Sequence, residues 1–172
     1  MLQPGQPMRV SFDLDEVLFV NPANHKVEPE LRFPKNKIYK ERLREGTPAL
    51  IHDLQSEGFE VWVYTSSFRT EKYIRGLFRS YGVRFDGIVN GQRHEAEVQR
   101  GHREKMPTKL PNRYQIKLHV DDEAIVCTYG KAYGFQVYHL DEQDDDWHAK
   151  IMHRVHEIRA ISERMYAEAH GG

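Results

Sequence analysis

A short apolar run at residues 10–12 ends in two carboxylates, Asp13 and Asp15. Such a run is typical of a parallel strand, and open α/β sheets carry their chemistry where strands stop and loops begin. Carboxylates at a strand end are also common as solvated turn residues. The pair therefore predicts the carboxyl end of a strand in an α/β sheet. Other parts of the sequence must show whether it belongs to a catalytic site or to a solvated turn.

A second strand is predicted to deliver hydroxyl groups to the same edge. Residues 61–64 form a continuous apolar run, as expected for a strand covered on both faces, and Thr65 and Ser66 follow it directly. The alternative interpretation is that these hydroxyls cap the next helix, predicted near 68–81. Both can hold, because the free N–H groups of a helix N-terminus attract anions.

A lysine and a second acidic pair complete the pattern. Asp121 and Asp122 close another predicted strand, and Lys109 precedes it. A lone lysine is often a solvated surface residue, and adjacent aspartates often form a turn. Lys105 and Lys117 are also near in sequence, but Lys117 would lie within or at the start of the strand. We therefore rank Lys109 first and Lys105 second.

The order of these motifs carries more information than any one of them. A D-x-D triplet, a strand-end threonine, a lysine and a strand-end Asp-Asp pair resemble, in that order, the four motifs of the haloacid dehalogenase-like (HAD-like) superfamily of phosphohydrolases. The resemblance spans roughly residues 8–140.

The resemblance implies a role for each motif in phosphate-monoester hydrolysis. Asp13 would attack phosphorus and form an aspartyl-phosphate, while Asp15 would protonate the leaving oxygen and then activate water. Thr65 and the backbone N–H of Ser66 would bind the phosphoryl group, and Lys109 would neutralise its oxygens.

The resemblance also implies a metal site. Asp121 would ligate the metal directly, and Asp122 would act through water or orient the shell. The Asp13 carboxylate and the Asp15 backbone carbonyl would complete an oxygen-only site that suits Mg²⁺.

The sequence departs from the family pattern at two places. Glu16 stands where a glycine, asparagine or small residue is common, so it adds a negative charge near the site and could restrict the substrate. His119 and Val120 precede the paired aspartates in place of the glycine often seen there.

The alternation of elements predicts one α/β fold, a doubly wound, Rossmann-like parallel sheet of about five strands with helices on both faces. We expect residues 1–172 to form a single HAD-like hydrolase domain with a poorly ordered lead-in at 1–7. A flap and loop at 16–46 would replace a full cap domain, since a packed domain needs about 50 residues. Strands are predicted near 8–13, 59–65, 85–89, 116–121 and 135–139, and helices near 47–57, 68–81 and 147–168.

The composition limits the partners and the compartment. A net charge of -1 and a pI of about 6.8 argue against a generic nucleic-acid or anionic-membrane binder, without excluding nucleic acid. The segments 26–45 and 92–109 are locally basic, and they would form either a rim that attracts phosphorylated substrates or merely solvated loops.

One cysteine cannot form an internal disulfide, and no early apolar run resembles a signal peptide or a membrane span, so we expect a cytoplasmic protein. A homo-oligomer stays possible.

The main competing hypothesis is a non-catalytic HAD-like domain that binds phosphate or regulates a partner. Asp13 and Asp15 argue against it, because a domain that only binds phosphate needs no proton donor.

Overall fold

The computed structural model describes residues 5–141 and 143–171. One five-stranded sheet in the order β3-β2-β1-β4-β5 forms its centre, and every neighbouring pair of strands is parallel. This confirms the predicted α/β fold. The strands are β1 (Arg9–Phe12), β2 (Glu60–Tyr64), β3 (Gly87–Val89), β4 (Ile116–Asp121) and β5 (Gln136–His139).

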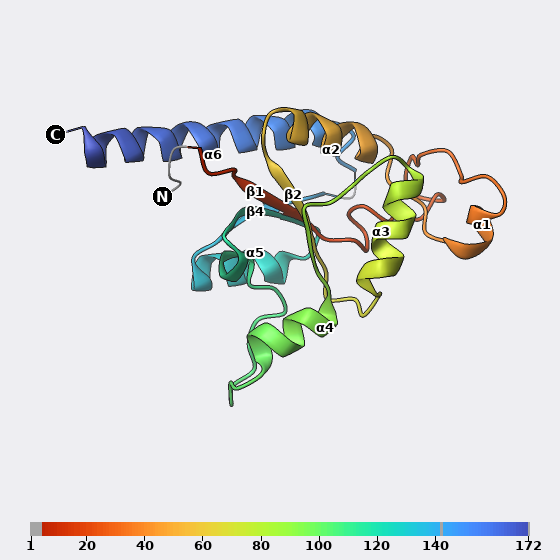
Figure 1. Ribbon diagram of the computed structural model, residues 1–172, viewed down its shortest axis with the longest axis horizontal. Coiled ribbons are helices and arrows are strands. Elements are labelled where there is room, and N and C mark those ends of the chain that lie inside the picture. Colours follow the sequence, from red (N-terminus) through yellow and green to blue (C-terminus); the bar gives the residue numbers. More distant parts are fainter. Residues whose placement is uncertain (1–4, 142, 172) are drawn as a thin grey trace.

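Helices cover both faces of this sheet. The helices α2 and α6 lie side by side over one face, and α4 and α5 lie on the opposite side (Figure 1). The helices are α1 (Lys35–Ile38), α2 (Thr47–Ser56), α3 (Glu71–Ser80), α4 (Gly91–His94), α5 (Ala124–Tyr133) and α6 (Trp147–His170), with a π-helical turn at Glu95–Gln99 and a 3₁₀ turn at Pro111–Tyr114.

The helix predicted near 68–81 begins later than expected. Its N-cap is Thr70, whose hydroxyl accepts a hydrogen bond from the N–H of Tyr73. Thr65 and Ser66 therefore do not cap α3, and the capping interpretation is wrong for both.

The strands divide the core between the two faces of the sheet. Val10, Phe12 and Val63 belong to the larger core, which includes side chains of α2, α3 and α6, whereas Tyr64 and Val89 belong to a smaller cluster on the other side. Burying a large apolar side chain completely contributes about 1.5–3 kcal/mol. This packing holds the ends of β1, β2 and β4 in one fixed arrangement.

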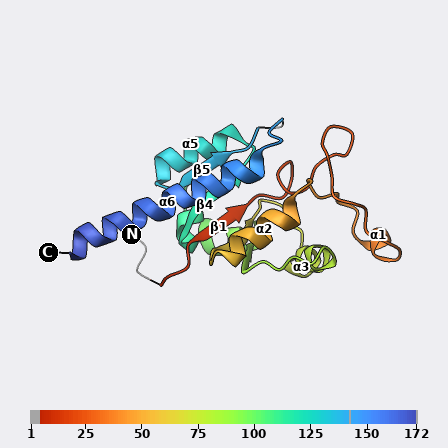
Figure 2. The ribbon, with the colours of Figure 1, turned by 90° about the horizontal axis from the view of Figure 1, so that it is seen from above.

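The segment 16–46, which we call the flap, leaves the sheet after β1 and returns to α2. Isolated bridges join Phe19 to Leu43 and Val27 to Arg44, and the one-turn helix α1 lies between them. Figure 2 shows the flap extending away from the sheet beside α3. Among residues 5–141 and 143–171, no helix combines the length and apolar composition of a membrane span.

Candidate active site

The candidate residues come together at the carboxyl ends of three adjacent strands. Asp13 follows β1, Thr65 follows β2, and Asp121 is the last residue of β4. The N–H of Asp13 donates to the Val120 carbonyl at 3.0 Å, which continues the ladder between the first and fourth strands for one more residue. All three side chains are buried, as is that of Lys109.

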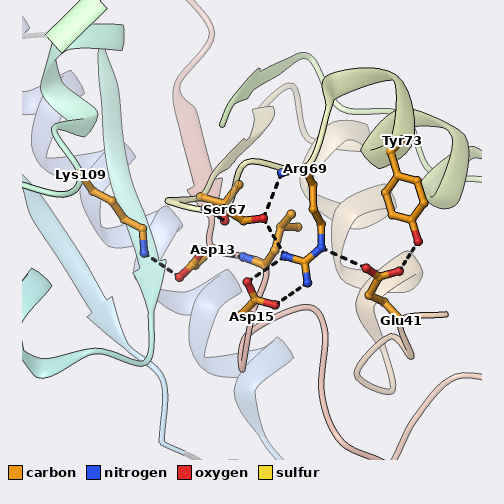
Figure 3. A network of polar contacts seen from close by, with 9 residues as sticks. Asp13, Asp15, Glu41, Ser67, Arg69, Tyr73 and Lys109 are labelled. Carbon is orange, nitrogen blue, oxygen red and sulfur yellow. Dashed lines mark hydrogen bonds and ion pairs between the residues drawn. The ribbon is translucent and has the colours of Figure 1, made fainter. Parts of the chain in front are cut away.

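Lys109 joins the acidic groups of two strands. Its Nζ lies 2.6 Å from Oδ2 of Asp13 and 2.5 Å from Oδ2 of Asp121 (Figure 3 shows the first contact). The Lys109 side chain is only 1% exposed, whereas Lys105 is exposed. Of the two candidate lysines, the fold places Lys109 beside Asp13.

Burial and charge act against each other in this cluster. Burial alone would lower the pKa of Lys109, but Asp13 and Asp121 outweigh it and the net shift is upward. Burial raises the pKa of Asp13 despite the nearby ammonium. For Asp121, burial is outweighed by His119 and Lys109, which lower its pKa to about 2. Lys109 therefore stays charged, and one cation serves two buried carboxyl groups.

Three carboxyl groups are close enough to share a cation. Asp13, Asp121 and Asp122 each offer an oxygen, and these oxygens lie within 4.8 Å of one another. Burial, together with the charge of Asp121, raises the pKa of Asp122 to about 6. An all-oxygen donor set of this kind fits a hard cation such as Mg²⁺. The ligand role of the Asp15 carbonyl stays a prediction.

The segment after β2 forms a tight turn. Oγ1 of Thr65 accepts a hydrogen bond from the N–H of Ser67 at 3.1 Å, and the side chain of Ser66 is exposed. Thr65 thus lies at the predicted sheet edge, and phosphoryl binding by Thr65 and Ser66 stays a prediction.

Asp15 points away from Asp13, toward an arginine that the sequence did not single out. Nη1 and Nη2 of Arg69 each lie 2.9 Å from one Asp15 oxygen, while Nε of Arg69 donates to Glu41 at 3.0 Å (Figure 3). The hydrogen bond with Asp15 is the main cause of a raised pKa at Arg69. No sequence signal pairs these residues, because Arg69 lies in irregular backbone and its partners are distant in the chain.

A buried hydrogen-bonded chain runs behind Asp121. Oγ of Ser11 lies 2.7 Å from Nδ1 of His119, and Nε2 of His119 lies 2.8 Å from Oδ2 of Asp121. The unusual histidine before the aspartate pair therefore orients the Asp121 carboxylate. Sequence reasoning noticed His119 but missed this role, because Ser11 comes from the neighbouring strand.

A second buried contact holds the loop that carries Lys109. The hydroxyl of Tyr64 lies 2.7 Å from Nδ1 of His94 and accepts the N–H of Leu110 at 3.0 Å. Because the Tyr64 oxygen accepts from Leu110, its hydrogen is free to be donated to His94. Burial lowers the pKa of His94, which favours the neutral ring that this bond requires.

Glu16 lies in a turn whose backbone conformation favours a small residue. Glu16 has a φ of 59°, in the left-handed region that glycine adopts most easily. Nη2 of Arg44 donates to the Glu16 carbonyl at 2.9 Å and its Nε to the Val17 carbonyl at 2.8 Å, which holds this turn. The Glu16 side chain is exposed.

The two basic segments contribute less free charge than their sequences indicate. Arg44 is buried against the turn just described, and Arg93 pairs with Glu97 at 3.0 Å. The exposed cations of these segments include Lys35, Lys37, Arg100 and Arg103.

No family model and no curated protein matches the sequence, but solved structures resemble the fold. A hydrolase from Streptococcus pneumoniae TIGR4 aligns with a TM-score of 0.51 at 14% identity, covering 78% of this chain and 93% of that chain. A HAD-superfamily hydrolase, subfamily IA, variant 1, from Geobacter sulfurreducens PCA gives 0.49 at 13% identity, covering 76% and 88%. A predicted HAD-like family hydrolase from Porphyromonas gingivalis gives 0.47 at 14% identity, covering 87% and 98%. At 14% identity, the likeness to the Streptococcus pneumoniae hydrolase concerns the fold alone.

Proposed function

We propose that this chain, which has the haloacid dehalogenase-like fold, hydrolyses phosphate monoesters through an aspartyl-phosphate intermediate on Asp13. One observation carries the proposal. The ammonium of Lys109 lies between the buried carboxyl groups of Asp13 and Asp121, at the end of the sheet where Thr65 follows β2.

The first half of the reaction transfers the phosphoryl group to the enzyme. An oxygen of Asp13 forms a bond to phosphorus while the bond from phosphorus to the leaving oxygen breaks, and Asp15 gives that oxygen its proton. The charge that spreads over the transferring oxygens would face Lys109 and the hydroxyl of Thr65.

The second half returns the enzyme to its starting state. Asp15 takes a proton from water, the water oxygen forms a bond to phosphorus, and the bond to Asp13 breaks to release inorganic phosphate. Asp15 therefore ends protonated, ready for the next leaving group.

The residues that would hold Mg²⁺ are Asp13, Asp121 and Asp122, with the Asp15 carbonyl as a further candidate. When bound, Mg²⁺ would supply positive charge that keeps the carboxyl groups ionised and lets a phosphate dianion approach them.

The substrate class stays broad, since a small metabolite, a nucleotide or a phosphate on a macromolecule each carries the group that this site would recognise. Exposed lysines and arginines near the flap and the 92–109 segment would favour anionic substrates.

The test is a panel of phosphate esters assayed with purified protein and Mg²⁺, followed by acid quenching to trap the phosphoenzyme. We expect phosphate release and a covalent phosphate that hydroxylamine removes, as for an acyl phosphate. Phosphate binding without release or phosphoenzyme would instead favour the non-catalytic alternative.

A further inference from the structure

Arg69 takes no direct part in the steps above, yet it holds Asp15, the residue that transfers both protons. Its Nη1 and Nη2 lie 2.9 Å from Oδ2 and Oδ1 of Asp15, respectively. Two parallel hydrogen bonds of this kind fix the plane and the direction of a carboxylate. The side chains are partly exposed, at 27% for Arg69 and 55% for Asp15, so the pair contributes little to stability. Its main effect is on the orientation of Asp15.

The guanidinium of Arg69 is itself held on several sides. Nε donates to Glu41 at 3.0 Å, Nη1 also donates to Oγ of Ser67 at 2.9 Å, and the group lies 5.3 Å from the centre of the Phe19 ring. Every guanidinium nitrogen therefore donates to a side chain, and two carboxylates face the charge. This arrangement fits a residue that positions Asp15 better than one that binds substrate phosphate.

Glu41 links this arginine to the flap. Its second oxygen accepts a hydrogen bond at 2.6 Å from the hydroxyl of Tyr73, a residue of α3 (Figure 3). The neighbouring Tyr39 packs edge-on against Tyr73 at 5.2 Å, and a Cβ at Gly76 would overlap the Tyr39 hydroxyl. The returning part of the flap is thus packed on α3 where it contacts Arg69.

We infer that Arg69 is a positioning residue for Asp15, and that the flap orients Arg69 through Glu41. This inference rests on the proposed function. In Figure 3 the Asp13 carboxylate points to Lys109 and the Asp15 carboxylate to Arg69. To protonate the leaving oxygen, Asp15 would carry the proton on one oxygen that has left Arg69, while its other oxygen stays bound to Arg69 and keeps the carboxyl group in place.

The test compares two substrates of nearly the same shape, 4-nitrophenyl phosphate and phenyl phosphate. Nitrophenolate is a weak base and leaves without a proton, whereas phenolate needs one. The value of kcat/KM reports the first half of the reaction, in which Asp15 is the proton donor. Arg69→Met should lower kcat/KM for phenyl phosphate by about 10²-fold, the usual cost of a misplaced catalytic group, and change it by less than about threefold for 4-nitrophenyl phosphate.

The control is Arg75→Met, which removes an arginine of α3 that pairs with Glu71. It should change neither value. Glu41→Gln should show the same split between substrates as Arg69→Met, but a smaller one, because only one side of the guanidinium is released. Circular dichroism checks that each variant is folded.

The outcomes separate this inference from the proposed function. If the wild-type protein with Mg²⁺ hydrolyses neither of these esters nor any other member of the phosphate-ester panel, the proposed function is overturned, and the role of Arg69 with it. If the wild type is active but Arg69→Met lowers kcat/KM equally for both substrates, or behaves like Arg75→Met, only the positioning role is overturned.

Discussion

Nζ of Lys109 lies 2.6 Å from Oδ2 of Asp13, although 96 positions separate the two residues in the chain. The lysine lies in a loop without regular structure, so the contact depends on how that loop closes over the sheet edge. Because Lys109 is buried between the carboxyl groups of Asp13 and Asp121, replacing it changes both the chemistry of the site and the stability of the fold.

Asp13→Asn should abolish turnover while leaving the fold intact. The substitution keeps the shape of the side chain but removes the nucleophile and one predicted metal ligand. Steady-state phosphatase assays measure the loss, and circular dichroism serves as the folding control. Retention of more than a few per cent of wild-type activity would show that Asp13 is not the nucleophile.

Lys109→Met should lower both activity and stability. Removing one partner of a buried ion pair typically costs about 3–5 kcal/mol, because the remaining charge is left unpaired in the low-dielectric interior of the protein. Here two carboxyl groups, on Asp13 and Asp121, would lose their shared cation. Urea unfolding measures the stability, and kcat should fall together with kcat/KM in protein that remains folded.

Lys105→Met is the matched control for that experiment. Lys105 is exposed, so its loss should leave the free energy of unfolding within about 0.5 kcal/mol of wild type. If Lys105→Met shows the kcat defect and Lys109→Met does not, the lysine assignment is wrong while the reaction class survives.

The ends of β1, β2 and β4 were predictable from sequence because a stretch rich in apolar residues stops there at a polar residue. Parallel strands bring such ends to one edge, so the approach of Asp13, Thr65 and Asp121 follows from the order of the motifs. α5 was missed because its buried side is small: Val126 and Gly130 are its buried residues, and its N-cap, Glu123, makes no side-chain hydrogen bond.

The contacts of the site with irregular backbone were not predictable. Arg69 meets Asp15 and Glu41 only because the flap folds back on α3, and no periodic pattern encodes that return. His119 was visible as a departure from the family pattern, but its partner Ser11 depends on the register between two strands. Side-chain pairs across distant loops are set by tertiary packing, which local sequence rules do not describe.

Chelation should abolish activity, and added Mg²⁺ should restore it. The carboxyl groups of Asp13, Asp121 and Asp122 offer oxygen donors alone, which Mg²⁺ prefers. Assays in excess chelator, before and after saturation with Mg²⁺, measure this dependence. Full activity in the chelator would contradict a metal requirement.

The buried contact between Tyr64 and His94 predicts a pH-dependent stability. Burial lowers the pKa of His94, with the Pro107 carbonyl and Glu95 opposing the shift and Lys109 adding to it. The unfolded chain binds a proton at His94 near a pH of about 6.5, whereas the folded chain binds it only at lower pH. Between these two pH values the unfolded state holds more protons than the folded state. The stability contributed by neutral His94 is therefore present at higher pH and is lost as the pH falls.

His94→Asn isolates this contribution, because the Asn oxygen can accept from Tyr64 but does not titrate. The free energy of unfolding of wild type minus that of the variant, measured with urea at about pH 7.5 and again at about pH 5.5, should decrease at the lower pH. All other histidines are common to both proteins and cancel in this difference. Protonation of His94 would also remove the acceptor of the Tyr64 hydroxyl, and this hydroxyl holds Leu110 next to Lys109. Over the same pH interval, kcat should therefore fall more in the wild type than in the variant. A stability difference that does not change with pH would show that His94 is not held neutral by the fold.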